Sequence, residues 1–120
     1  MRVIVAGSRT ITDSSLVFDA IEKSGITVTE VISGGARGVD TIGWEWALLR
    51  GIPTKVFKAE WFKYGQSAGP RRNREMANYC GKDAALILIW DGASKGSSNM
   101  KKEALRVGMK VHEVVVPNDH

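Results

Sequence analysis

The sequence predicts a single domain of the α/β class, a three-layer sandwich around a five-stranded parallel sheet. Two observations support this prediction. Five short apolar segments alternate along the chain with four segments of helical character, which is the order of a sheet covered by crossover helices. The apolar segments are nearly continuous runs, as expected for parallel strands that helices cover on both faces. The 120 residues suffice to bury one core without a metal or a disulfide.

The first half of the chain is expected to contain three strands and two helices. In order, these are a strand at residues 2–7, a helix between residues 13 and 25, a strand at 27–33, a helix at 40–50 and a strand at 54–59. The first strand is a continuous β-branched run, and the first helix has an apolar pattern of helical period. Asp13 is a suitable N-cap for that helix and Gly25 a suitable end. Gly51 closes the second helix, and Pro53 opens the third strand.

The second half is expected to contain two helices and two strands. In order, these are an aromatic, glycine-containing connection at residues 60–69, a helix at 70–80, a strand at 84–90, a loop at 91–98, a helix at 99–108 and a strand at 110–116. Pro70 fits the first turn of a helix, where its missing N–H costs nothing. Residues 117–120 are expected to be a frayed C-terminal tail, so that the single domain spans residues 1–116.

The composition excludes several classes of protein. Cys80 is the only cysteine, so no internal disulfide can form, and no group of Cys and His residues has the spacing of metal ligands. The N-terminal apolar run VIVAG is too short for a signal peptide, and no stretch is long enough to span a membrane. We therefore expect a cytoplasmic protein with no metal, no cofactor and no membrane partner. The net charge of +4 suits an anionic partner.

The unusual loops all follow strands. They lie at residues 7–9, 33–38, 60–73 and 90–98, whereas the connections at the opposite ends of the strands are short and carry few polar groups. In open parallel α/β sheets, ligands bind beyond the carboxyl ends of the strands, near the point where the strand order reverses. The sequence therefore predicts a binding site at the carboxyl edge of the sheet.

The loop SGGARG at residues 33–38 has two interpretations. Gly34, Gly35 and Gly38 lack a Cβ atom, so backbone N–H groups can approach an anion, and the next helix presents its positive N-terminal end. The loop would then be a phosphate seat. It is equally interpreted as a tight turn whose glycines serve packing. A second loop, at residues 92–98, also leads into a helix, and the two loops together favour a nucleotide-like ligand anchored at two points.

Charged and aromatic side chains accompany these loops. The cations are Arg9, Arg37, Arg71, Arg72 and Lys95, and the aromatic residues are Trp61, Phe62 and Tyr64. Guanidinium groups suit phosphate oxygens, although long cations on loops also form solvated rims. The aromatic rings either stack on a base or pack at the sheet edge or against another subunit. Asp40 and Asp91 suit ribose hydroxyls or a base edge, and Asp40 suits equally the capping of its helix.

Four ordered segments, VIVAGSRT, VISGGARGVD, AGPRRNREM and LILIWDGASKGSSNM, resemble the SLOG superfamily. They cover nearly the whole chain, and they are most similar to the small YspA-like, YpsA-related SLOG proteins of bacteria and phages. The resemblance implies a Rossmann-like sheet with the strand order 3-2-1-4-5. It also implies homodimers or larger assemblies that bind a nucleotide or a nucleotide-derived molecule in the crevice at the carboxyl ends of the strands.

The loops and the resemblance together define the expected ligand-binding residues. These are Gly7, Ser8, Arg9, Ser33, Gly34, Gly35, Arg37, Gly38, Asp40, Arg72, Asn73, Asp91, Gly92, Lys95, Gly96, Ser97 and Ser98.

Catalysis is less well supported. The lonely-guy enzymes of the superfamily cleave the N-glycosidic bond of nucleoside 5′-monophosphates with an arginine in an RKxxM-type segment and a glutamate in PGGxGTxxE. Arg72 and Met76 match the first segment, but Met100 stands where the glutamate is expected, and Glu103 lies about one helical turn further on. The missing carboxylate would stabilise an oxocarbenium-like centre or activate water. The candidates for a catalytic role are Arg72, Asp40 and Asp91, with Glu75 as a further substitute for the glutamate.

Three functions remain open after this comparison. The first is a non-catalytic module that binds a nucleotide-derived molecule, such as an ADP-ribose-like or cyclic signal, as a sensor or as a phage-type sequestering protein. The second is a nucleoside 5′-monophosphate phosphoribohydrolase or a related N-glycosidase. The third is binding of single-stranded DNA, as in the DprA branch of the superfamily. The modest net charge ranks nucleic acid last among these partners.

Overall fold

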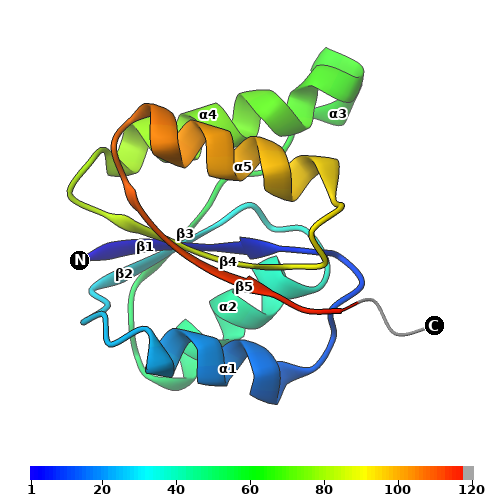
Figure 1. Cartoon of the computed structure of the whole chain (residues 1–120). Coiled ribbons are helices and arrows are strands. Elements are labelled where there is room, and N and C mark those ends of the chain that lie inside the picture. Colours follow the sequence, from blue (N-terminus) through cyan, green and yellow to red (C-terminus); the bar gives the residue numbers. More distant parts are fainter. Residues whose placement is uncertain (118–120) are drawn as a thin grey trace.

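The computed structural model describes residues 1–117, and it has the predicted architecture. The sheet is parallel, with the strand order β3-β2-β1-β4-β5 (Figure 1). The strands are β1 (Arg2–Gly7), β2 (Glu30–Ser33), β3 (Thr54–Val56), β4 (Ala85–Trp90) and β5 (Lys110–Val115). The helices are α1 (Ser14–Lys23), α2 (Val39–Leu49), α3 (Trp61–Tyr64), α4 (Ala68–Cys80) and α5 (Lys95–Arg106), with a 3₁₀ helix η1 (Gly65–Ser67) before α4. The predicted fold class and strand order are confirmed.

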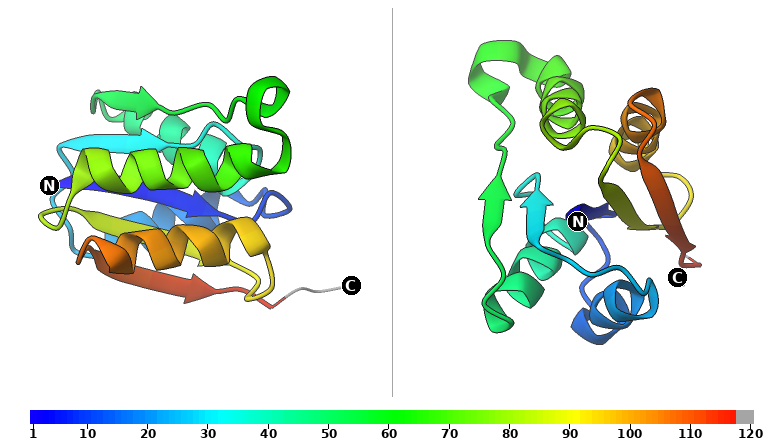
Figure 2. Two further views of the ribbon diagram at one scale, coloured as in Figure 1. Left: turned by 90° about the horizontal axis from the view of Figure 1, so that it is seen from above. Right: turned by 90° about the vertical axis from the view of Figure 1, so that its left-hand side faces the viewer.

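The path of the chain opens a crevice at one edge of the sheet. The chain starts in the central strand β1, moves outward through β2 to β3, and then crosses back to β4 and β5. Helices α1 and α2 cover one face, and α4 and α5 cover the other, which Figure 2 shows from two further sides. The connections after β1 and β4 therefore leave the sheet on opposite faces. The carboxyl ends of these two strands form the switch point, where α/β proteins bind ligands.

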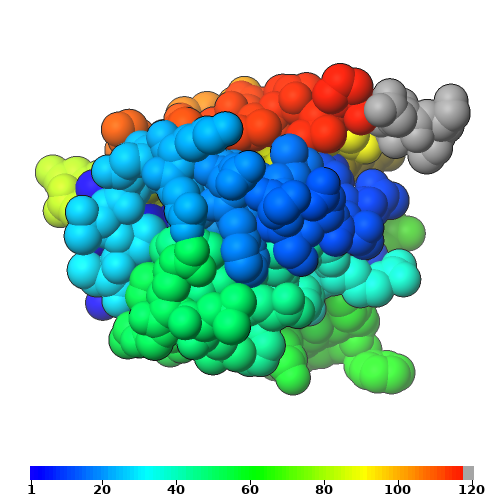
Figure 3. Space-filling view, turned by 90° about the horizontal axis from the view of Figure 1, so that it is seen from below, coloured from blue at the N-terminus to red at the C-terminus, as the bar shows by residue number. Residues whose placement is uncertain are grey.

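Alternate residues of the central strand support two separate cores. Val3 and Val5 of β1 belong to the core under α1 and α2, whereas Ile4 and Ala6 belong to the core under α4 and α5. All four are buried, as expected for a strand covered on both faces. Figure 3 shows the lower face, where the side chains of α1 and α2 form a closed layer over the sheet.

Glycine brings α2 close to the sheet. A Cβ atom on Gly43 would lie 2.5 Å from Cγ1 of Val5, so no larger residue fits there without movement of the strand or the helix. The first helix also follows the prediction, because Oδ1 of Asp13 accepts the N–H of Ser15 at 3.0 Å. In α1 and α2, the local sequence preferences and the packing against the sheet favour the same structure. The two helices therefore hold the loops at the carboxyl edge in fixed positions.

Several predicted boundaries were wrong. The second and third strands begin or end several residues inside the predicted ranges 27–33 and 54–59. The connection predicted at 60–69 contains α3 and η1, and α4 begins at Ala68. The loop predicted at 91–98 ends early, since α5 begins at Lys95 after the N-cap Ser94. The predicted tail, residues 117–120, lies outside the described residues except for Pro117.

Candidate functional site

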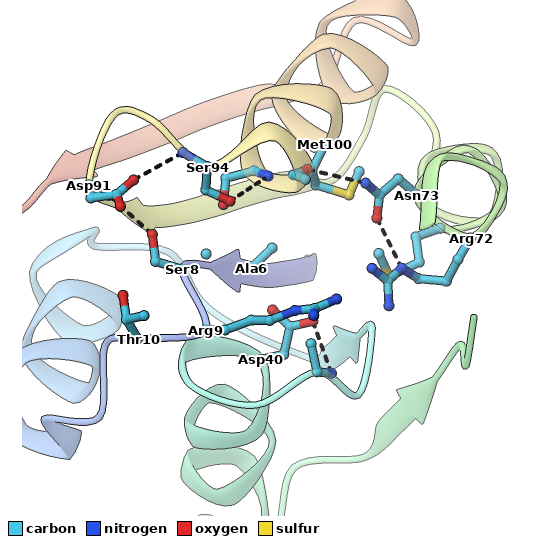
Figure 4. Close-up of a pocket in the computed structure, with 15 residues that line it drawn as sticks. Ala6, Ser8, Arg9, Thr10, Asp40, Arg72, Asn73, Asp91, Ser94 and Met100 are labelled. Carbon is cyan, nitrogen blue, oxygen red and sulfur yellow. Dashed lines mark hydrogen bonds between the residues drawn. The ribbon is translucent and has the colours of Figure 1, made fainter. Parts of the chain in front are cut away.

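A pocket of about 300 Å³ lies at the carboxyl ends of β1 and β4 (Figure 4). It is bounded by the loop after β1, the loop before α2, the first half of α4, the loop after β4 and the first turns of α5. Its lining residues are Ala6, Gly7, Ser8, Arg9, Thr10, Ala36, Asp40, Arg72, Asn73, Met76, Asp91, Ser94, Gly96, Ser97 and Met100. The pocket therefore lies at the switch point of the sheet, where the sequence placed the site.

The loop after β1 is fixed by Ser8. The Ser8 N–H donates to the carbonyl oxygen of Ile89 at 3.1 Å, and the buried Ser8 hydroxyl accepts the N–H of Asp91 at 3.1 Å. A Cβ atom on Gly7 would lie 1.8 Å from the same Ile89 oxygen, so glycine is required for β1 and β4 to pair this closely. Beyond this anchored turn, the exposed Arg9 extends across the pocket above Asp40 (Figure 4).

The glycine loop before α2 uses its own side chains to satisfy backbone donors. The Ser33 hydroxyl accepts the N–H of Gly35 at 3.1 Å and donates to the Asp40 carbonyl at 3.0 Å. Oδ2 of Asp40 accepts the N–H of Ala36 at 3.4 Å. The buried Asp40 carboxylate thus occupies a position near the α2 N-terminus where an anion is favoured. The loop is a tight turn, and two of its N–H groups are already engaged.

Asp40 is the most perturbed acid of the pocket. Burial raises the pKa of its carboxyl from 3.8 to about 6. The groups that lower this pKa, in decreasing order, are Arg72, the backbone N–H groups of Ala36 and Gly7, and Arg9. Burial also lowers the pKa of Arg72, while Asp40 raises it. A carboxyl group that titrates this close to neutral pH is typical of functional sites.

Arg72 and Asn73 attach α4 to the pocket. Nη1 of Arg72 donates to the Gly34 carbonyl at 2.7 Å, and Nε donates to Oδ1 of Asn73 at 3.0 Å. The buried Asn73 in turn donates to Oδ1 of Asn99 at 2.9 Å, which joins α4 to α5. A Cβ atom on Gly34 would lie 2.7 Å from Nη1 of Arg72, so the glycine leaves room for the guanidinium group. These contacts hold the guanidinium group at the boundary of the pocket.

The N-terminus of α5 is partly capped by its own loop. Oδ1 of Asp91 accepts the N–H groups of Ala93 at 2.9 Å and Ser94 at 3.0 Å, and these bonds lower the pKa of Asp91. The Ser94 hydroxyl accepts the N–H of Ser97 at 3.3 Å. The Ser97 hydroxyl is buried at the pocket and has no hydrogen-bond partner within residues 1–117. A buried hydroxyl of this kind is costly unless a ligand or a solvent molecule provides a partner.

The residue at the position where the sequence comparison expects a glutamate, Met100, belongs to the apolar part of the pocket. Met100 lines the pocket with an exposed fraction of only 1%. Glu103 does not line it, and its carboxylate forms an ion pair with Nε of Arg106 at 2.8 Å. Glu75 is exposed on α4 and also lies outside the lining. Of the carboxylates considered from the sequence, only Asp40 and Asp91 reach the pocket.

The structure divides the predicted ligand-binding residues into four groups. Those that line the pocket are Gly7, Ser8, Arg9, Asp40, Arg72, Asn73, Asp91, Gly96 and Ser97. Gly34, Gly35 and Arg37 line a second pocket of about 350 Å³, which shares Arg9, Ala36 and Arg72 with the first. Gly92, Lys95 and Ser98 line a separate hollow with Trp90 and Lys102. Ser33 and Gly38 shape the glycine loop, and a Cβ atom on Gly38 would lie 2.4 Å from the Ser8 carbonyl oxygen.

Several lining residues were not predicted as ligand-binding. Ala6, Thr10, Ala36, Met76, Ser94 and Met100 complete the first pocket. Lys58 and Ala59 complete the second, together with Trp61, for which the sequence left stacking on a base as one alternative. The helical spacing from Arg72 to Met76 and from Ser97 to Met100 places these pairs on common helix faces, which is a signal that could have found the methionines. Of the loop aromatics, Trp61 reaches a pocket, whereas Tyr64 lies under the guanidinium group of Arg71 at 4.2 Å.

No helix within residues 1–117 is both long and apolar enough to cross a membrane. No three His, Cys, Asp or Glu side chains of these described residues come together in a way that could hold a metal ion.

Fold and pocket together define a Rossmann-like α/β protein with a polar site at the switch point of its sheet. The chain belongs to the YspA, cpYpsA-related SLOG family, because the model of that family matches residues 1–64, more than half of the chain. The resemblance seen in the four sequence segments is therefore confirmed.

Two known proteins are similar to the whole chain. The gene 61 protein of Mycobacterium phage D29 is 32% identical over 121 aligned residues, which cover 92% of this chain and 93% of the phage protein. The crystal structure of DNA processing protein A (DprA) from Streptococcus pneumoniae superimposes with a TM-score of 0.74 at 21% identity. This match covers 98% of the present chain but 50% of the DprA chain. The likeness therefore shows only that this chain shares the fold of about half of the DprA chain.

Proposed function

We propose that the protein binds a nucleotide or a nucleotide-derived small molecule in the first pocket. The observation that carries the proposal is the convergence of Arg9, Arg72 and the unpartnered Ser97 hydroxyl on one pocket at the switch point. Guanidinium groups suit phosphate oxygens, and the buried hydroxyl gains a partner when a polar ligand binds. The volume of about 300 Å³ is within the range of small-molecule sites.

The carboxylates of the pocket suit the sugar of such a ligand. Asp91 is accessible at the pocket, and its lowered pKa keeps it ionised at neutral pH, ready to accept hydrogen bonds from ribose hydroxyls. Met76 and Met100 provide apolar surface beside these polar groups. A mixture of apolar walls and a few convergent polar groups is typical of ligand pockets.

Binding without cleavage is the mode that the pocket supports best. Met100 occupies the position expected for the catalytic glutamate, and Glu103 is engaged with Arg106. We therefore propose a cytoplasmic sensor or sequestering protein that acts as a homodimer or a larger assembly. Light scattering of the purified protein would measure that assembly.

Isothermal titration against a panel of mononucleotides, cyclic nucleotides and ADP-ribose-like compounds tests the proposal. We expect saturable binding of at least one compound, and we expect Arg9→Gln to weaken it because Arg9 extends across the pocket. Arg74→Gln is the matched control, since Arg74 is exposed and lines neither pocket. If no compound of the panel binds, or if both variants lose the same affinity, the proposal is wrong.

A second candidate function, N-glycosidase activity, is favoured by one observation. Asp40 is a buried carboxyl with a pKa of about 6 in the same pocket as Arg72, which are properties of a general acid or base. Incubation with nucleoside 5′-monophosphates, followed by chromatographic detection of free base, tests this function. Release of base by the natural protein but not by Asp40→Asn would support it, and no release over long incubation would exclude it for these substrates.

A further inference from the structure

The second pocket adjoins the first. It has a volume of about 350 Å³, and Arg9, Ala36 and Arg72 line both pockets. Its own walls come from the glycine loop, from Lys58 and Ala59 after β3, and from Trp61 at the start of α3. Arg9 and Arg72 can therefore contact ligand groups placed in either pocket.

The two pockets differ in charge. Four cations, Arg9, Arg37, Lys58 and Arg72, line the second pocket, and no acidic residue lines it. The first pocket contains the carboxylates Asp40 and Asp91. Phosphate groups placed in the first pocket would meet these carboxylates, whereas the charged residues that line the second pocket are all cations.

In the part of the chain that the structure describes, the cations of the second pocket are held without an ion pair to a carboxylate, although Asp40 of the first pocket lies near Arg72 and Arg9. Within residues 1–117, ion pairs engage Arg2, Arg50, Lys101 and Arg106, but none of the four cations of the second pocket. Arg9 also lowers the pKa of Arg72, which is the expected effect of neighbouring like charges. A bound anion would relieve this repulsion and could accept bidentate hydrogen bonds from the guanidinium groups.

We propose that the ligand spans both pockets, with its nucleoside in the first pocket and its phosphates over Arg9, Arg37, Lys58 and Arg72 in the second. The preferred ligand class is then a nucleotide with two or more phosphates, or with a pyrophosphate bridge, rather than a nucleoside or a nucleoside monophosphate. The exposed Trp61 forms the outer wall, where a group attached to the terminal phosphate would contact its ring. This inference rests on the proposed function, because it assumes a nucleotide in the first pocket.

Titration calorimetry with matched nucleosides, 5′-monophosphates and 5′-diphosphates of the four common bases tests the inference. For the base that binds best, we expect the diphosphate to bind about tenfold or more tightly than the monophosphate, a difference of about 1.4 kcal/mol. The double variant Arg37→Gln/Lys58→Gln should reduce this diphosphate-to-monophosphate ratio at least about fivefold. The double variant Arg74→Gln/Lys82→Gln removes the same charge at exposed positions outside both pockets and should keep the ratio.

The possible results separate this inference from the proposed function. Equal affinity for monophosphate and diphosphate in the natural protein would overturn the inference and leave the proposed function intact. No binding of these nucleotides would overturn the inference, and no binding of the cyclic and ADP-ribose-like compounds either would also overturn the proposed function. A 12-residue thymidine oligonucleotide that binds more tightly than the diphosphate and displaces it would also overturn the inference, because the cations would then serve a DNA backbone. Circular dichroism of each variant confirms that the ratio is compared between folded proteins.

Discussion

Asp40 combines a structural role with an electrostatic cost. Its carboxylate accepts the N–H of Ala36 and faces Arg72 and Arg9, yet burial outweighs these contacts and raises the pKa from 3.8 to about 6. The difference corresponds to about 3 kcal/mol that the ionised group costs the folded state, an upper figure for a buried site. Because the folded state holds this proton more tightly than the unfolded chain, the favourable contribution is present below about pH 4 and is lost as the pH rises through 6.

Removal of the Asp40 charge is therefore expected to stabilise the protein at neutral pH. Asp40→Asn retains an oxygen that can accept the Ala36 N–H, and it should raise the free energy of unfolding at pH 7.5 by about 1–3 kcal/mol. Near pH 4 the gain should disappear, because the natural carboxyl is then protonated in the folded state. Urea unfolding of the natural protein and the variant at pH 7.5 and near pH 4 measures the difference in the free energy of unfolding at each pH. A variant that is less stable at pH 7.5 would contradict the burial argument.

Asp91→Asn is expected to destabilise the protein at neutral pH, in contrast to Asp40→Asn. The N–H groups of Ala93 and Ser94 lower the pKa of Asp91, so its ionised form is favoured in the folded state. Its substitution should reduce stability at pH 7.5, and the loss should shrink as the pH falls below the ordinary range of a carboxyl group.

Gly34 determines where the Arg72 guanidinium group can lie. A Cβ atom at residue 34 would lie 2.7 Å from Nη1 of Arg72 and 2.8 Å from Oδ2 of Asp40. The far end of Arg72 can move, so Gly34→Ala should fold but displace the guanidinium group and weaken ligand affinity by about tenfold. Calorimetry of the folded variant measures this loss. Unchanged affinity would show that Arg72 does not bind the ligand from its present position.

Gly38 is the contrasting glycine of the same loop. It has a φ of +77°, and a Cβ atom there would lie 2.4 Å from the Ser8 carbonyl oxygen, which is backbone and cannot easily move. Gly38→Ala should therefore lower the stability of the whole domain by more than about 1 kcal/mol, in addition to any effect on binding.

At the scale of elements, α5 shows why helix boundaries were predicted less well than helix positions. Residues 96–98 are Gly, Ser and Ser, which have low helix propensity and are common in loops. In the structure, the Ser94 hydroxyl accepts the Ser97 N–H, the Asp91 carboxylate accepts the N–H of the N-cap residue Ser94, and Ser97 and Met100 line the pocket. Capping and packing thus extend the helix into residues whose local preference is a loop.

Two serines of α5 should respond in opposite ways to substitution by alanine. Ser94→Ala removes the N-cap and should cost about 1 kcal/mol of stability. Ser97→Ala removes a buried hydroxyl without a protein partner and should leave stability unchanged or slightly higher, while ligand affinity falls. Thermal unfolding measures the stability of the two variants, and titration calorimetry measures their ligand affinity. Loss of stability in Ser97→Ala without loss of affinity would assign the hydroxyl a purely structural role.

The edge strand β3 shows what sequence patterns could and could not predict about the site. The four loops at the carboxyl edge follow from strand order alone, so the first pocket was predicted in position. The second pocket depends on Lys58 and Trp61, which come together with the glycine loop only because α3 turns the chain back after the short β3. A four-residue helix has no periodic signal. Similarly, which N–H groups of the glycine loop are free depends on Ser33 and Asp40 side chains, and not on the glycine spacing.

At the scale of the whole molecule, the pocket connects both layers of helices. It joins α2 on one face of the sheet to α4 and α5 on the other through the ends of β1 and β4. A ligand held by all of these elements binds the folded protein and not the unfolded chain. Ligand binding should therefore appear as stabilisation of the entire domain.

The midpoint of thermal unfolding, Tm, tests this coupling. At a concentration of 100 times Kd, the ligand should stabilise the folded state by about 2.7 kcal/mol, which corresponds to a rise in Tm of about 10 °C for a domain of this size. Arg9→Gln should lose most of the rise, because Arg9 lines both pockets, and the exposed Arg74→Gln should keep it. A rise of the same size in Arg9→Gln would show that the ligand does not contact the Arg9 guanidinium group.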